Sequence, residues 1–431
     1  MKLYNLKDKN EIVNFSNAVK LGLGSKQGLF FPEKLPILSQ EKITKLLKKK
    51  FIPRSQKILS LLIGNEIQKK NIYSSVKSAF SSYKPKIYNL KKNISCFELF
   101  HGPTLAFKDY GAKFMAQILS LLNKKNKKST TILTATSGDT GAAVAHAFYK
   151  IKNIKVIILY PKGKISDIQR KLFSTLGKNI TTIAIDGSFD DCQELVKKSF
   201  NDQEIKKYTQ LNSANSINIS RLFAQICYFF EIFHLIHKNS EKKIVISIPC
   251  GNFGNLTAAL LAKSMGLKIK KLILSTNSND TIPRFLKTGI WNPFPTISTI
   301  SNAMDISKPN NWTRVQEIFK RKKWNIKDLG YGSVSEKETR KKIQELFKKY
   351  KYISEPHSSI AYTLLKRKLK KEEHGIFLGT AHPIKFKNTV EEVLKIKLKK
   401  PDIISNLSNL KELCHNIKPN FNTLKKILIN T

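Results

Sequence analysis

Cysteine is scarce in this chain, and its five cysteines are too far apart to act together. They stand at Cys96, Cys192, Cys227, Cys250 and Cys414, and no two of them form a C-x-x-C pair. A disulfide-stabilised small fold and a cysteine zinc site both need closely spaced cysteines. We therefore expect ordinary free thiols and no metal site.

Long hydrophobic runs are also missing. No stretch reaches the roughly eighteen uninterrupted apolar residues that a membrane helix needs. The first residues, MKLYNLKDKNEIVNF, lack the apolar core of a signal peptide. We therefore expect a cytoplasmic protein with no membrane partner. Its 431 residues are enough for two or three domains.

Acidic residues are few, with 31 Asp and Glu against 77 Lys and Arg, which gives a net charge of +46. Such a charge attracts polyanions by counterion release, so nucleic-acid binding is a hypothesis to weigh. The lysines, however, are spread over the whole chain, and no helix-turn-helix, zinc-finger or RNA-binding motif accompanies them. We expect no specific nucleic-acid function. A/T-rich codon usage explains the joint abundance of lysine, isoleucine and asparagine more simply.

The pattern of hydrophobic residues divides the chain into three parts. Residues 1–90 mix short apolar segments with lysine-rich helical stretches and form an N-terminal module. In residues 91–390, β-branched runs alternate with amphipathic stretches of helical length, which is typical of α/β layers around largely parallel sheets. About 130–205 form a smaller α/β subdomain within this core, and 391–431 form a C-terminal helical extension. The expected strands are 130–136, 155–160, 180–186, 243–249, 271–277 and 375–381.

A first loop with chemical potential, CGNFGN, joins an expected strand directly to an expected helix. It contains Gly251, Asn252, Phe253, Gly254 and Asn255. Glycines let the backbone approach a ligand closely, and the free amides at a helix start attract a phosphate. The loop matches neither the P-loop nor G-x-G-x-x-G. A tight turn without a ligand is an equally good interpretation of this motif taken alone.

A second loop, TSGDTGAA, stands in the same position between strand and helix. Ser137, Gly138, Asp139 and Thr140 offer hydroxyls and amides that can hold a carboxylate, such as that of an amino acid. The alternative is a simple helix cap in which a Ser or Thr hydroxyl closes the helix.

A third segment, HGPTLAFKDYGAKF, places Lys108 between Phe107 and Asp109 in otherwise apolar surroundings, with a helix expected to begin near Gly111. A lysine that is partly removed from water loses its preference for the charged form and becomes a nucleophilic amine suited to Schiff-base chemistry. A lysine in so basic a chain is usually a solvated surface residue. The interpretation therefore depends on the other two loops.

Histidines stand in several polar segments without forming a metal site. His101, His357 and His382 lie beside Pro or Gly, and we expect them to brace loops by hydrogen bonds. His234 and His237 are one helical turn apart, but no further ligand is near them in the sequence. We interpret that pair as helix surface.

Six ordered motifs together carry a resemblance to a known family. HGPTLAFKD, TATSGDTGAA, LNSANSINISR, GNFGNLTA, SNAMD and FLGTAHPIKF resemble threonine synthase in its longer bacterial form, and the similarity runs over nearly the whole chain. That family has the tryptophan-synthase-β-like α/β fold, called fold type II, of pyridoxal-phosphate enzymes. The resemblance implies a carbon–oxygen lyase that converts O-phospho-L-homoserine and water to L-threonine and phosphate.

The resemblance also implies how pyridoxal 5′-phosphate is held. Lys108 is expected to form the Schiff-base link to it, and the loop 251–255 to bind its phosphate. Thr380 is expected to hydrogen-bond the pyridine nitrogen. A neutral hydroxyl at that nitrogen leaves the ring less fully protonated than a carboxylate partner does and tempers its electron withdrawal.

The resemblance implies a substrate site as well. Residues 137–140 are expected to receive the substrate carboxylate or to lie against the ring. Asn215, Asn218, Ser220 and Arg221 are expected near the substrate, with Arg221 suited to its phosphate by bidentate geometry.

Two other functions stay open at this point. One is a related fold type II dehydratase acting on an unphosphorylated amino acid, which yields ammonia and a keto acid. The other is an inactive, threonine-synthase-like scaffold that binds polyanions. The expected partners are the small-molecule substrate and, for assembly, either none or a second copy, as a monomer or homodimer.

Overall fold

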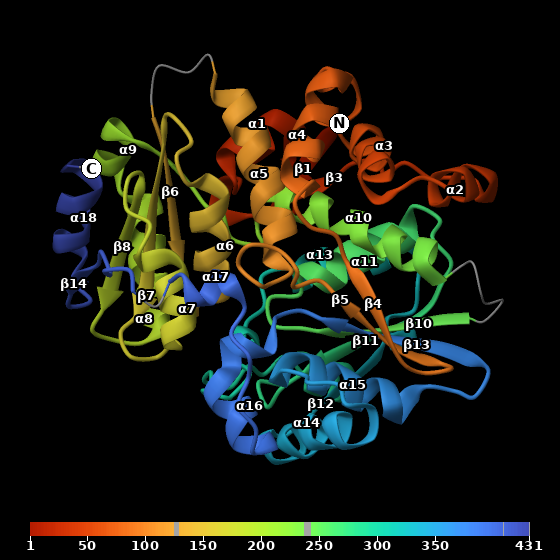
Figure 1. Cartoon of the computed structure of the whole chain (residues 1–431). Helices are drawn as coiled ribbons and strands as arrows, with labels where there is room; N and C mark the ends of the chain where they lie inside the picture. Colours follow the sequence, from red (N-terminus) through yellow and green to blue (C-terminus); the bar gives the residue numbers. More distant parts are fainter. Residues whose placement is uncertain (125–128, 237–242, 408, 431) are drawn as a thin grey trace.

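Three β-sheets organise the protein, one in each of three regions (Figure 1). The computed structural model describes residues 1–124, 129–236, 243–407 and 409–430. In this part of the chain, a three-stranded sheet lies near the N-terminus, a six-stranded sheet forms the centre of a large α/β region, and a five-stranded sheet forms the centre of a smaller one.

The N-terminal residues form a small antiparallel sheet with order β2-β1-β3, followed by amphipathic helices. The apolar faces of these helices are buried and their lysines point outward, as the sequence pattern requires. The elements are β1 (Lys2–Asn5), β2 (Asp8–Asn14), α1 (Phe15–Leu21), η1 (Ser25–Gln27), β3 (Phe30–Pro32), α2 (Gln40–Leu47), α3 (Phe51–Ile63), η2 (Gly64–Glu66) and α4 (Lys69–Phe80).

The six-stranded sheet is parallel except at one edge, where β4 pairs antiparallel with β5. Its central strands are buried on both faces, which explains their continuous runs of isoleucine, valine and leucine. In the order of the sheet the strands are β12 (Gly330–Ser333), β11 (Ile269–Thr276), β10 (Lys243–Pro249), β13 (Glu373–Gly379), β5 (Ile94–Glu98) and β4 (Lys86–Lys91).

Helices cover both faces of this sheet (Figure 1). One face packs against α15, which is itself covered by α14, and the other lies toward α11, α10 and α5. The helices of this region are α5 (Lys108–Asn123), α10 (Ile219–Ile236), α11 (Gly254–Ser264), α12 (Thr281–Thr288), η3 (Asn302–Met304), α13 (Trp312–Lys322), η4 (Ile326–Asp328), α14 (Glu336–Tyr350) and α15 (Pro356–Lys368).

The five-stranded sheet is fully parallel, with α6 and α7 between it and the large region and α8 on its other side. Ser166 and Ser188 start α7 and α8 with reciprocal capping boxes. The elements are β6 (Thr130–Ala135), α6 (Asp139–Phe148), β7 (Ile154–Pro161), α7 (Asp167–Ser174), β8 (Ile180–Ile185), α8 (Phe189–Asn201), α9 (Gln203–Tyr208) and β9 (Gln210–Asn212).

The C-terminal residues return to the small region and are not purely helical. A short strand pairs with β8 at the edge of the five-stranded sheet, and the last helix packs against α8 and α9. The sequence predicted only helices here, because a three-residue strand is too short to show a period. The elements are η5 (Pro383–Phe386), α16 (Lys387–Leu394), α17 (Asp402–Ser405), β14 (His415–Ile417) and α18 (Phe421–Asn430).

Helix α10 forms the apolar centre of the molecule. By length and composition it is the one described helix that could cross a membrane, but 89% of it is buried inside the protein, as in a core helix. His234 near its end bonds the carbonyl of Leu47 through Nδ1 at 2.6 Å, so it is not plain helix surface. His237 lies outside the described residues.

The six strands predicted from the sequence are confirmed, each within two residues of its expected ends. The helix expected near Gly111 begins three residues earlier, at Lys108. The carboxylate of Asp109 accepts hydrogen bonds from the amide and hydroxyl of Thr104, at 3.0 and 2.5 Å, and so stabilises the turn that starts the helix. The division into domains stays a prediction.

Candidate active site

A cavity of about 250 Å³ lies between the two α/β regions, where β6 and β10 end. Ligands commonly bind at the carboxyl ends of parallel strands, because helices start there and leave free amides. Most of the site residues predicted from the sequence line this cavity: Lys108, Ser137, Asp139, Thr140, Asn215, Arg221, Gly251, Asn252, Phe253, Gly254, Asn255 and Thr380.

Three predicted residues are buried beside the cavity without lining it. Gly138 packs against Gln169, where an added Cβ would lie 2.7 Å from the Gln169 side chain. The hydroxyl of Ser220 bonds the side-chain oxygen of Asn218 at 2.7 Å. Asn218 in turn donates to the carbonyl of Val19 at 3.0 Å. Ser220 and Asn218 therefore join the cavity wall to the N-terminal module.

Lys108 is the first residue of α5, and its ammonium group lies in the cavity wall. Its side chain is only 14% exposed, and Nζ is 3.8 Å from Oδ2 of Asp139. Burial lowers the pKa of Lys108 to about 8, and Lys385 and Arg221 act in the same direction. Asp139 opposes this shift without cancelling it. A far larger fraction of Lys108 is therefore neutral near pH 8 than of an ordinary lysine, as a nucleophilic amine requires.

Asp139 is buried and shared between two lysines. Its Oδ1 pairs with Nζ of Lys385 at 2.5 Å and also accepts from Nε2 of Gln169 at 3.0 Å. Burial alone would raise the pKa of Asp139, but Lys385 and Lys108 hold it well below its usual value. The fully buried Lys385 also donates to the carbonyl of Thr104 at 2.9 Å. Asp139 is therefore a fixed carboxylate within a compensated charge cluster.

The loop around Ser137 leaves backbone amides pointing at the cavity. The helix cap of α6 is Gly138, with φ of 124° and no side-chain cap. The hydroxyl of Thr136 accepts the amides of Gly138 and Gly141, at 3.0 and 2.8 Å. Among the described residues, the amides of Ser137, Asp139 and Thr140 have no protein acceptor. The helix start is thus available to an anion.

The loop after β10 is organised in the same way, without charged side chains. Phe253 takes the left-handed conformation, with φ of 61°, and turns the chain into α11. A Cβ on Gly251 would lie 2.6 Å from the carbonyl oxygen of Ala303, so only glycine fits there. Asn252 is held by Ser216 and by the amide of Asn310, at 2.9 and 2.6 Å. In the described part of the chain, no amide of 251–255 donates to a protein atom.

Arg221 and Asn215 lie deeper in the wall. Arg221 is 2% exposed and donates through Nη1 to the carbonyl of Ala214, and its Nε has no partner in the part of the chain that the structure describes. Burial lowers its pKa to about 10, although Asp109 and Tyr228 oppose the shift. Asn215 accepts from the Thr134 hydroxyl at 2.7 Å.

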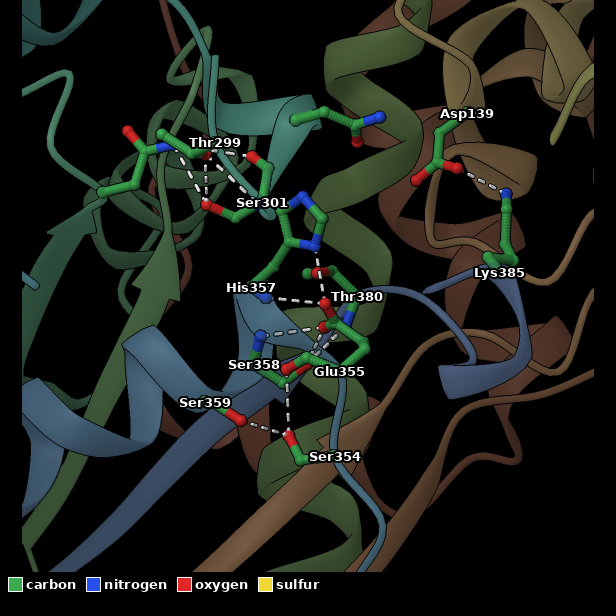
Figure 2. A network of polar contacts seen from close by, with 12 residues as sticks. Asp139, Thr299, Ser301, Ser354, Glu355, His357, Ser358, Ser359, Thr380 and Lys385 are labelled. Carbon is green, nitrogen blue, oxygen red and sulfur yellow. Dashed lines mark hydrogen bonds and ion pairs between the residues drawn. The ribbon is translucent and has the colours of Figure 1, made fainter. Parts of the chain in front are cut away.

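Thr380 follows β13 and faces the cavity beside a carboxylate–histidine pair that the sequence analysis did not predict (Figure 2). Its amide donates to the Ser358 hydroxyl at 3.4 Å, and that hydroxyl donates to Glu355. Glu355 also pairs with Nδ1 of His357 at 2.5 Å. Among the described residues the Thr380 hydroxyl has no protein partner, so it is available to a ligand.

Sequence reasoning missed Lys385, Glu355 and the cavity position of His357. Lys385 lies in the motif FLGTAHPIKF, and Glu355 stands two residues before His357, but nothing local distinguishes a buried charge from a surface one. His357 was expected to brace a loop, and its bond to Glu355 agrees with this, yet its ring also lines the cavity.

The N-terminal module also reaches the cavity, through Leu23 and Gln27. Lys26 and Gln27 have positive φ values of 53° and 56°, which non-glycine residues adopt only when their surroundings enforce them. Asn5 and Glu11 bond the neighbouring turn, with 2.8 Å from the amide of Ser25 to Glu11. The three glycines within residues 21–28 are the sequence signal that could have indicated this turn.

Family models match nearly the whole chain. A model described as threonine synthase N terminus matches residues 4–80, and one described as pyridoxal-phosphate dependent enzyme matches 89–377. A third, for the threonine synthase C-terminal part, matches 358–428.

Within the described residues, no group of three or more His, Cys, Asp or Glu side chains could hold a metal ion.

Individual proteins agree with the family models. A threonine synthase of Buchnera aphidicola subsp. Baizongia pistaciae is 64% identical over 429 residues, covering 100% of both chains. The crystal structure of threonine synthase from Escherichia coli has a TM-score of 0.95 at 54% identity and covers 100% of each chain. The pyridoxal-phosphate-bound threonine synthase from Brucella melitensis has a TM-score of 0.92 at 28% identity, covering 100% of this chain and 99% of that one. The chain therefore belongs to the threonine synthase family of pyridoxal-phosphate-dependent enzymes, with their fold type II α/β architecture.

Proposed function

We propose that this enzyme converts O-phospho-L-homoserine and water to L-threonine and phosphate, with pyridoxal phosphate held covalently by Lys108. One observation carries the assignment of the lysine. Lys108 is a buried amine with a pKa near 8 in a cavity that it shares with two helix starts bearing free amides. Schiff-base formation needs the neutral amine, and two anionic groups need the amides.

The loop 251–255 suits the cofactor phosphate. Its free amides, the dipole of α11 and the close contact of Gly251 with Ala303 form a cradle that an added side chain would fill. The side-chain nitrogen of Asn255 is buried and lacks a partner among the described residues, so it is a further donor for such a group. The residues present therefore fit a bound phosphate. When bound, pyridoxal phosphate supplies a conjugated ring that delocalises negative charge from the substrate Cα.

Other residues of the cavity suit the amino-acid substrate. The amides of Ser137 and Thr140 can bind its carboxylate, as can the hydroxyls of these residues, and Asn215 lies beside them. Arg221 places a permanent positive charge under the cavity, which favours the substrate phosphate there. The Thr380 hydroxyl is available to the pyridine nitrogen.

Lys108 is the natural proton carrier of the reaction. Once the substrate amine replaces it, its amine can take the proton from Cα and return it to a carbon of the product. Asp139 and Lys385 keep the charge around Lys108 constant during such transfers, because they remain paired with each other at 2.5 Å. The low exposure of the Lys108 side chain, 14%, limits proton exchange between its amine and bulk water.

The decisive experiment replaces Lys108 with Ala and uses Lys113→Ala as its control. Lys113 lies on the same helix but does not line the cavity. Lys108→Ala is expected to abolish turnover, the absorbance of the Schiff-base link and borohydride labelling, whereas Lys113→Ala keeps all three. Full activity with an intact chromophore in Lys108→Ala contradicts the assignment.

Product analysis separates this function from that of a dehydratase. Wild-type enzyme is expected to release inorganic phosphate and threonine in equal amounts. Ammonia and a keto acid from an unphosphorylated substrate would instead identify a dehydratase. The solved threonine deaminase from Solanum lycopersicum shares the fold only, with 14% identity and a TM-score of 0.56.

We further propose that the enzyme works in the cytoplasm as a monomer or homodimer, without a nucleic-acid or membrane partner. The lysines that produce the charge of +46 are spread over the whole chain, which supports a solvated surface. Light scattering of the purified protein measures its mass, and nuclease treatment that changes that mass would contradict the proposal.

A further inference from the structure

His357 carries a buried polar atom that no protein group satisfies. The side chain is 4% exposed and lines the cavity, and Nε2 has no hydrogen-bond partner among the described residues. An unpaired buried nitrogen is destabilising, so such atoms usually serve a ligand. The loop-bracing interpretation accounts for Nδ1 and leaves Nε2 unexplained.

Glu355 fixes the orientation of this imidazole. Its Oε2 lies 2.5 Å from Nδ1 of His357 and accepts the His357 amide at 2.6 Å. Its Oε1 accepts the amide of Ser358 at 2.8 Å, so the carboxylate is held on the N-terminus of α15. A carboxylate at Nδ1 keeps a proton there and turns Nε2 toward the cavity.

The pair is buried as a unit. Glu355 is 1% exposed, and among the ion pairs of the described residues its partner is His357. Both oxygens of Glu355 are taken by His357 and Ser358, so Nε2 is the polar atom of the pair that is left for a ligand.

The other neighbours of the ring do not account for Nε2. Phe386 contacts it edge to face, with ring centroids 4.9 Å apart. Thr299 and Ser301 also lie near the ring (Figure 2). They bond each other and belong to one polar network with Asp305 and Asn277. Asp305 is the second acid that faces the imidazole, and it interacts with it through charge without a hydrogen bond.

His357 is connected to Thr380 through the same carboxylate. The Thr380 amide donates to the Ser358 hydroxyl, and that hydroxyl and His357 share Glu355. Figure 2 shows the two side chains drawn together around Glu355, and both line the cavity. Thr380 and His357 therefore belong to one connected part of the cavity wall, which a single ligand can contact.

We propose that His357, held by Glu355, is a second hydrogen-bond partner of the bound cofactor at its ring-nitrogen end, beside Thr380. This inference rests on the proposed function, in which Thr380 meets that nitrogen. A threonine hydroxyl alone gives the ring nitrogen one neutral hydrogen bond, and an oriented imidazole beside it gives the protein a second control over the electron withdrawal on which loss of the Cα proton depends.

¹⁵N NMR tests the contact between His357 and the cofactor without measuring enzyme activity. The chain has 8 histidines, and His357→Asn identifies the resonance of residue 357 in ¹⁵N-histidine-labelled protein. Adding pyridoxal phosphate is expected to shift the His357 Nε2 signal. His101 is the matched control, because it pairs with Glu98 at 2.9 Å without lining the cavity, and its signal is expected to stay. An unchanged His357 signal in saturated enzyme overturns the proposal.

The holoenzyme gives a second readout. His357→Asn and Glu355→Gln are each expected to move the absorbance maximum of the bound cofactor and to lower kcat about ten- to hundredfold, with KM changed much less. Borohydride must still label Lys108 in both variants. Unlabelled wild-type Lys108 would refute the proposed function itself. Labelled variants with wild-type spectra and kcat would refute only the role of His357.

Discussion

The two loops that start α6 and α11 share one backbone design and differ in charge. Each follows a buried parallel strand, contains a glycine that a larger residue could not replace, and leaves amides free at a helix start. The loop at 137–141 contains Asp139 with Lys385 and Lys108 around it, whereas the loop at 251–255 has no charged side chain.

This difference separates the two anions that the site must hold. A helix start without a carboxylate suits a dianion such as a phosphate ester. A helix start that carries Asp139 repels a dianion, but the two lysines neutralise it enough for a single carboxylate. The charges therefore select the ligand of each loop, and the backbone only makes binding possible.

The largest expected effect comes from removing the neutralising charge with Lys385→Met. Asp139 then remains buried without its closest cation, and the free energy of unfolding is expected to fall by about 3–5 kcal/mol. Urea unfolding followed by circular dichroism measures this. The double variant with Asp139→Asn should recover part of the loss, since it removes the orphaned charge. Equal stability of Lys385→Met and wild type would mean that the cluster does not balance charge.

The second test uses the pKa of Lys108. Because the neutral amine reacts, the rate at which the apoenzyme captures pyridoxal phosphate should rise with pH, with a midpoint near 8 instead of the 10.5 of an ordinary lysine. Asp139→Asn should move that midpoint lower, since Asp139 raises the pKa. Stopped-flow absorbance gives the profile, and a wild-type midpoint above pH 10 would contradict the buried amine.

Gly251→Ala tests the uncharged loop. The new Cβ would meet the backbone of residues 303 and 304 at 2.6 and 2.9 Å, and that backbone cannot rotate away. Overpacking of this kind costs about 1–3 kcal/mol, so the Kd of pyridoxal phosphate should rise about five- to hundredfold. Gly332→Ala is the control, because its Cβ would meet only the flexible end of Leu364 at 3.0 Å. Fluorescence titration of both variant apoenzymes with pyridoxal phosphate measures the two Kd values. An unchanged Kd in Gly251→Ala would contradict the prediction.

Two substitutions with small expected effects should distinguish the ligands of the two loops most clearly. Asn252→Ala removes two bonds that brace the 251–255 loop and should weaken cofactor binding about fivefold, with little change in substrate KM. Thr136→Val removes the acceptor of the Gly138 and Gly141 amides and should raise substrate KM by a similar factor, with cofactor affinity unchanged. If both variants changed the same parameter, the assignment of one loop to the cofactor and the other to the substrate would be wrong.

The sequence was sufficient for the parts of this fold that are encoded locally. Buried strands have continuous β-branched runs, and six were located from that pattern alone. Loops such as CGNFGN and TSGDTG can be recognised in the sequence, because glycine and small polar residues directly follow a strand. The short edge strands β9 and β14, with three residues each, carry no such pattern and were missed.

The interior charges could not be predicted, because they depend on partners far away in the chain. Lys385 lies 246 positions beyond Asp139, and only the fold brings their side chains to 2.5 Å. Gln27 reaches the cavity from a module with no evident chemistry. Resemblance located Lys108, whereas the positions of Glu355 and His357 required three-dimensional packing.

The short strand at His415–Ile417 has a consequence for solubility. It covers the outer edge of β8, pairing with Ile183, Ala184 and Ile185. Without it, that sheet would end in an exposed row of unpaired amides and carbonyls, which is a template for edge-to-edge association of two molecules. The final residues thus protect the sheet edge from aggregation. A chain that stops before residue 415 should therefore self-associate, although it still contains every residue of the cavity.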